Sequence, residues 1–140
     1  MTWSDAYLSI PYADLGRDGI GCDCWGLARL VYARELGIEL PSYAGAYVCS
    51  AEREEVAGLL DEAERAGPWR RVAGEAPPPF AILLFRRGRL RSHVGVAIDA
   101  RRMLHMDERA GASVVRLADP RFASRFMGAF THLSRGENRP

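Results

Sequence analysis

The stretch "GCDCWGLARL" (residues 21–30) places two of the chain's three cysteines on either side of one aspartate. From Cys24 onward the apolar residues recur at positions 24, 27, 28 and 31, which is the spacing of one helix face. Gly37 comes after this run and is a typical C-terminal stop for a helix. The pattern therefore predicts a helix from about Cys24 to Leu36, with Asp23 as its N-cap and the Cys24 thiol in its first turn.

The segments that follow indicate a change from helices to strands. A second helix is predicted over residues 51–67, with Ser50 as its N-cap. Short apolar or alternating runs separated by turn residues then predict strands at 80–85, 92–99, 103–107, 112–118 and 127–134. A short helix begun by Asp119 and Pro120 interrupts them. This order predicts an α+β fold, with N-terminal helices packed on a C-terminal antiparallel sheet.

Length and composition are those of an ordinary soluble globular protein. The 140 residues suit a single domain over 1–140, with 48% apolar and 26% charged residues. A net charge of +1 gives no bulk electrostatic case for binding nucleic acid. No run approaches the roughly 20 apolar residues that insert into a bilayer. The N-terminus lacks the features of a signal peptide, so we expect synthesis in the cytoplasm.

Arginines are concentrated in two segments, residues 85–91 and 99–103. Such segments are most often the solvated ends of hairpins. The alternative is that they contact an anionic surface or partner. The sequence leaves both interpretations open.

Cys24 and two histidines form a candidate catalytic set. A thiol in the first turn of a helix lies at the positive end of the helix dipole, which favours the nucleophilic thiolate. His93 and His105 fall on two predicted strands joined by a turn near residue 100, so they are expected to be diagonal neighbours in an antiparallel pair. This arrangement suits a nucleophile, a base and an orienting residue. The alternative is a small buried cysteine beside structural histidines.

The remaining cysteines and the third histidine have structural interpretations. Cys22 is interpreted as a buried packing residue, with a reversible disulfide to Cys24 or a metal-ligand role as alternatives. Zinc would require Cys22, Cys24, His93 and His105 together, although the C-x-C spacing is tighter than in usual zinc sites. Cys49 is interpreted as structural, and His132 as a surface residue.

Three segments, "DCWGLARLVYARELGIELPSY", "SHVGVAI" and "MLHM", make residues 3–133 resemble the NlpC/P60 family of cysteine peptidases. The "DCWGL" and "ELGIELP" elements are most similar to its phage-tail branch. The resemblance implies the papain-like α+β fold, with Cys24 as nucleophile, His93 as base and His105 as orienting residue. It also assigns Tyr12 of "IPY" to the oxyanion site. Trp25 stands where many relatives have a serine that helps to hold the substrate.

The resemblance also implies a function. It predicts a peptidase that cleaves an amide bond in peptidoglycan stem peptides without a metal or organic cofactor. The phage-tail branch implies that other tail-tip or hub proteins are partners, and that the protein acts from the virion tail in the bacterial periplasm or cell wall. The alternative is a tail-tip structural or assembly protein that keeps the peptidase fold without catalysis.

Overall fold

The computed structural model describes residues 2–13, 17–40, 69–72, 76–87 and 90–132. It has a helix packed on a six-stranded antiparallel sheet, so the predicted α+β fold is confirmed. The predicted helix over 51–67 and Cys49 lie outside the described residues.

The helix predicted over 24–36 is confirmed in two parts. Helix α1 covers Cys24–Val31, and a π-helical turn, η2, continues it over Tyr32–Leu36. Gly37 ends the helix with φ of 67°, in the left-handed region that glycine adopts without strain. The residues of the predicted apolar spacing, Cys24, Leu27, Ala28 and Val31, are all buried, and Trp25 is buried as well. A 3-10 helix, η1, precedes α1 over Trp3–Tyr7.

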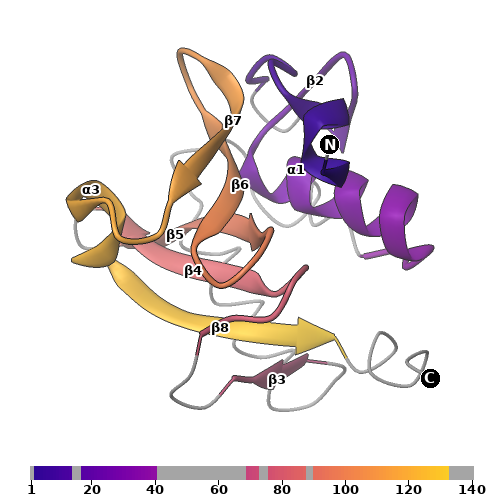
Figure 1. The fold of residues 1–140 in the computed structure, drawn as a ribbon. Coiled ribbons are helices and arrows are strands. Elements are labelled where there is room, and N and C mark those ends of the chain that lie inside the picture. The colour runs from indigo at the N-terminus through magenta and orange to yellow at the C-terminus, as the bar shows by residue number, and fades with distance from the viewer. Residues whose placement is uncertain (1, 14–16, 41–68, 73–75, 88–89, 133–140) are drawn as a thin grey trace.

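The main sheet has the strand order β3-β8-β4-β5-β6-β7 (Figure 1). Its strands are β3 (Trp69–Arg71), β4 (Ile82–Arg87), β5 (Leu90–Ala97), β6 (Arg102–Asp107), β7 (Gly111–Arg116) and β8 (Phe126–His132). The short helix α3 (Pro120–Ala123) leads into β8, as predicted from Asp119 and Pro120. Two two-residue strands, β1 (Arg17–Asp18) and β2 (Gly21–Cys22), form a separate hairpin just before α1.

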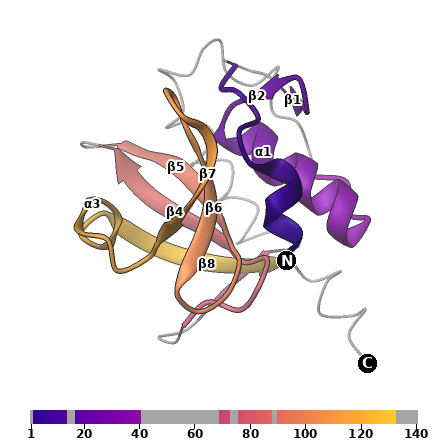
Figure 2. The same cartoon turned by 45° about the horizontal axis from the view of Figure 1, so that its top comes forward.

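The two faces of the sheet have different packing partners. One face contributes Ile82, Leu84 and Val96, among others, to a core that contains the buried residues of α1. Alternate strand residues such as Leu83 and Met103 belong to a second cluster, which contains Phe122 of α3. Figure 2 shows α1 and α3 on opposite sides of the β6–β7 hairpin. Helix α1 itself packs against β5 and β6.

His132 is buried, so its interpretation as a surface residue is wrong. Only 9% of its surface is exposed, and its ring packs edge-on against Trp69 with the ring centres 5.0 Å apart. Trp69 is its cross-strand partner in β3. The sequence pattern does not predict β3, and this strand makes β8 an interior strand with a neighbour on each side. A histidine predicted on a terminal strand is therefore covered by an element that the pattern did not reveal.

Three aspartates organise the turns of the second half of the chain. The carboxylates of Asp99 and Asp107 each accept hydrogen bonds from two backbone N–H groups of the turn that follows. Asp119 caps α3 and pairs with the Arg121 guanidinium. These contacts hold the pKa of each carboxyl below its ordinary value, chiefly through the N–H of Arg101 for Asp99, the N–H of Ala110 for Asp107, and Arg121 for Asp119.

We expect these carboxyls to make the fold less stable in acid. A carboxyl whose pKa is lower in the folded state stabilises that state above its unfolded pKa and loses this contribution as the pH falls through the folded pKa. The free energy of unfolding should therefore decrease from about pH 5 downward, modestly because the groups are exposed to solvent. Urea unfolding at a series of pH values checks this. The triple variant Asp99→Asn/Asp107→Asn/Asp119→Asn should show a flatter acid limb, and an unchanged limb would contradict the assignment.

Candidate active site

Cys24 is the first residue of α1 and is 7% exposed. The predicted N-cap is confirmed, because the Asp23 carboxylate accepts the backbone N–H of Gly26 at 2.8 Å. Cys22 is fully buried, as its interpretation as a packing residue predicted. Cys22 and Cys24 are both free cysteines. The cap thus fixes the helix start, and Cys24 lies at the positive end of the helix dipole.

Replacing Asp23 should destabilise the start of α1. Loss of a side-chain N-cap costs about 1 kcal/mol, within a range of about 0.5–2 kcal/mol. Asp23→Ala should therefore lower the free energy of unfolding by about that amount, whereas Asp23→Asn keeps a capping oxygen and should retain most of it. Urea denaturation of both variants distinguishes them. Equal losses would show that the negative charge, rather than the cap, is what the helix uses.

The structure brings His93 and His105 together as predicted from the spacing. Gly95 of β5 pairs with His105 of β6, which places His93 two residues away and diagonal to it. The two rings are nearly perpendicular, with their centres 5.2 Å apart, and Nε2 of His93 lies 3.1 Å from Nδ1 of His105. Both histidines are buried. A Cβ at Gly95 would lie 2.6 Å from the sulfur of Met103 and 3.3 Å from the carbonyl oxygen of Leu104, so a glycine there leaves room for β6.

The contact between the histidines assigns different roles to the two nitrogens of His93. If Nδ1 is to accept a proton from a thiol, His93 must carry its own hydrogen on Nε2. That hydrogen is then donated to Nδ1 of His105, which acts as the acceptor. In that tautomer, the hydrogen bond to His105 would fix the orientation of the His93 ring.

Aromatic rings and charged side chains surround the histidine pair. Phe122 of α3 meets His105 edge-on at 5.0 Å between ring centres, and Phe85 of β4 lies 6.2 Å from His93. A cavity of about 150 Å³ opens beside the pair. Its lining includes the charged residues Arg86, Asp107, Glu108, Arg121 and Arg125. Of these residues, only Arg86 belongs to a segment that the sequence pattern marked for its charge, the arginine-rich stretch 85–91. Asp107 could have been predicted from the strand pattern, because a residue two positions after His105 on the same strand lies on the same face of the sheet.

Tyr12 lies on the segment that leads to the cysteine. Its backbone forms a parallel bridge with Cys22, and backbone hydrogen bonds join Pro11 and Ala13 to Cys22 on either side of it. The Tyr12 side chain is half-buried and packs against the main core. Backbone hydrogen bonds thus hold the segment around Tyr12 beside Cys22, two residues before Cys24.

Trp25 is a core residue. It is 1% exposed and belongs to the main core cluster with Leu27 and Val31. The residue that differs from the serine of many relatives therefore packs inside the protein.

The described residues contain no group of three or more His, Cys, Asp or Glu side chains arranged to hold a metal ion. Cys22, Cys24, His93 and His105, which the zinc alternative required together, therefore do not form such a group in the described part of the chain. None of the helices that the structure describes is long and apolar enough to cross a membrane.

A helix that begins at a cysteine and packs on an antiparallel sheet with a histidine pair defines a papain-like α+β domain. The model of the NlpC/P60 family matches residues 9–131, so the chain belongs to the NlpC/P60 family. No curated protein matches the sequence significantly.

Three solved structures share this fold. The NlpC/P60 domain of the peptidoglycan hydrolase SagA has a TM-score of 0.59 and 21% identity, over 91% of this chain and 92% of that one. An NlpC/P60 family protein from Bacillus cereus has a TM-score of 0.66 and 21% identity, over 93% of this chain and 38% of that one. A lipoprotein-like NLP/P60 family protein from Staphylococcus aureus has a TM-score of 0.65 and 18% identity, over 93% and 39%. The chain therefore spans about two fifths of the last two proteins.

Proposed function

We propose that this protein is a cysteine peptidase that cleaves an amide bond in peptidoglycan stem peptides. The observation that carries the proposal is the His93–His105 contact on strands packed against the helix that begins at Cys24. Membership of the NlpC/P60 family supports it. So does the similarity of the fold to the corresponding domain of a peptidoglycan hydrolase.

The proposed reaction begins with the Cys24 thiol. Nδ1 of His93 takes the thiol proton, and the sulfur attacks the carbonyl carbon of the scissile amide. The backbone N–H of Cys24 and the hydroxyl of Tyr12 stabilise the oxyanion that forms. His93 then protonates the leaving amine, which departs and leaves a thioester. Water, deprotonated by His93, hydrolyses that thioester and restores the thiol. His105 holds the His93 ring in place throughout.

We further propose that the protein is a component of a phage tail or tail-like particle and acts in the bacterial cell wall. The support is the "DCWGL" motif (residues 23–27) followed by "ELGIELP" (residues 35–41), which resemble the phage-tail branch of the family. Its partners would be other tail-tip or hub proteins.

Digestion of purified peptidoglycan tests the enzymatic function. The wild-type protein should release new amino groups, and mass spectrometry of the soluble products identifies the bond that is cut. Cys24→Ala should abolish release, because the thioester cannot form, whereas Cys22→Ala should retain it if it folds. A wild-type protein without turnover, combined with normal particle assembly by Cys24→Ala, would contradict catalysis. That result would favour the structural tail-tip alternative.

A further inference from the structure

A second and larger cavity lies next to the cavity of the histidine pair, and Phe85 lines both. Its volume is about 760 Å³, within the range of roughly 300–1,000 Å³ that is typical of ligand sites. Its lining comes from the turn between β5 and β6, the end of β7, α3 and β8. Neither His93 nor His105 is among the lining residues, and the proposed reaction assigns no role to the arginines that are.

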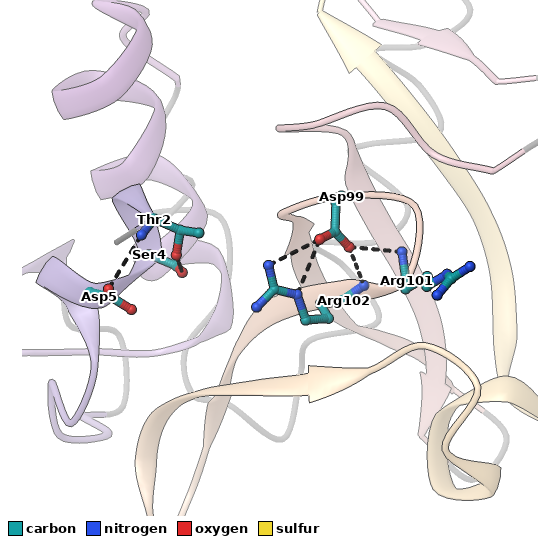
Figure 3. Close-up of polar contacts among 6 residues, drawn as sticks. All are labelled: Thr2, Ser4, Asp5, Asp99, Arg101 and Arg102. Carbon is teal, nitrogen blue, oxygen red and sulfur yellow. Dashed lines mark hydrogen bonds and ion pairs between the residues drawn. The ribbon is translucent and has the colours of Figure 1, made fainter.

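Three arginines meet at one edge of this cavity. Arg102 and Arg116 are direct cross-strand partners in β6 and β7, and Arg101 precedes Arg102 in the turn. Like charges placed directly opposite on neighbouring strands are unfavourable. The lining contains one carboxylate, Asp99, and it binds Arg102, with Nη2 and Oδ2 3.0 Å apart (Figure 3). Within the described lining, one arginine is thus paired and two charges are left uncompensated.

Arg101 and Arg116 carry the uncompensated charge. The backbone N–H of Arg101 donates to Asp99, but its guanidinium points away from that carboxylate (Figure 3). No described residue forms an ion pair with either guanidinium. The backbone N–H of Leu117 donates to the carbonyl of Arg101 at 2.8 Å, which holds the two arginine-bearing segments side by side.

Apolar side chains line the rest of the cavity, among them Phe85, Leu117 and Phe126. Phe126 is 46% exposed, although large apolar side chains are mostly buried in the described part of the chain. Phenylalanine and arginine are both enriched in protein–protein interfaces relative to the rest of the surface. A simple inorganic anion would leave this apolar surface uncovered, so the cavity suits a ligand that is both anionic and apolar.

We propose that this cavity binds an acidic peptide segment of a partner protein. An apolar side chain of the segment rests against Phe85, Leu117 and Phe126, and its carboxylates pair with Arg101 and Arg116. The arginine-rich segment 99–103 thereby acquires a binding role, independent of the cysteine and the histidine pair. Because the pairs form at a solvated rim, salt should weaken binding.

Fluorescence anisotropy with two labelled peptides tests the proposal. The full chain is titrated against the acidic peptide GEDLEG and the uncharged analogue GQNLQG at low and at high salt. At low salt, we expect the acidic peptide to bind at least about tenfold more tightly than the uncharged analogue. Arg101→Glu/Arg116→Glu should weaken its binding by a similar factor. A matched control, Arg70→Glu/Arg109→Glu, makes the same charge change at exposed arginines outside the cavity and should alter the dissociation constant less than about twofold.

Additional measurements distinguish an acidic peptide from other anionic ligands. Phe126→Ser should weaken peptide binding without changing its salt dependence. Competition by inorganic phosphate alone, or binding only to vesicles that contain phosphatidylglycerol, would overturn the peptide assignment. Equal binding of GEDLEG and GQNLQG would also overturn it, as would an equal effect of the two double variants. The milder Arg101→Gln/Arg116→Gln variant repeats the test if charge reversal disturbs folding, which circular dichroism detects.

Discussion

His93→Ala is expected to reduce the proposed peptidase activity by about 10³-fold or more, because general acid–base catalysis contributes about 10²–10⁴-fold and, in the proposed mechanism, the same imidazole generates the thiolate. The same variant should slow alkylation of Cys24 by iodoacetamide at pH 7 by about tenfold. In the wild type, label should appear on Cys24 and not on the fully buried Cys22. Peptide mass mapping over a time course measures both rates.

His132→Ala is the matched control for His93→Ala. His132 is also a buried histidine of the sheet, but it packs against Trp69 and Tyr32 rather than beside His105. Its replacement should lower stability and leave the alkylation rate of Cys24 unchanged. His105→Asn should retain more activity than His105→Ala, since an amide oxygen can still accept the Nε2 hydrogen of His93. Equal alkylation rates for His93→Ala and His132→Ala would remove His93 from the role of base.

Trp25→Ser is expected to cause a large loss of stability, about 3–5 kcal/mol, because the indole is almost fully buried in the main core. The serine found in many relatives should thus not be tolerated at this position without compensating changes. Urea unfolding measures the free energy. Trp25→Phe, which keeps an aromatic ring in the same space, should lose distinctly less.

A different result for Trp25→Ser would reassign this residue. If the variant lost less than about 1 kcal/mol and changed which muropeptides are cut, Trp25 would be a substrate contact rather than a core residue. We expect the opposite. Its activity, measured below the unfolding transition, should keep the product pattern of the wild type.

Local patterns predicted the elements that carry the candidate site. The apolar spacing and Gly37 located the helix that begins at Cys24, and Asp23 was correctly assigned as its cap. The turn near residue 100 gave the diagonal relation of His93 and His105, which the register of β5 and β6 confirms. These features depend on residues close in sequence, so helix periodicity and hairpin geometry suffice to predict them.

Residues whose environment depends on distant segments were not predicted correctly. His132 was assigned to the surface because nothing in its own strand indicates that β3, about 60 residues earlier, covers it. The role of Trp25 was left open by the sequence because a tryptophan in the first turn of a helix can face solvent, substrate or core.

The helix that begins at the cysteine, the strands β4 to β8 and the approach of the two histidines were determined by the sequence alone, because each follows from periodicity, capping or a short hairpin. The burial of His132 and Trp25 was decided by tertiary structure. So was the cavity where Arg101 and Arg116 converge. These features arise where segments far apart in the chain meet. Their burial depends on contacts between residues distant in sequence, which a local sequence pattern does not contain.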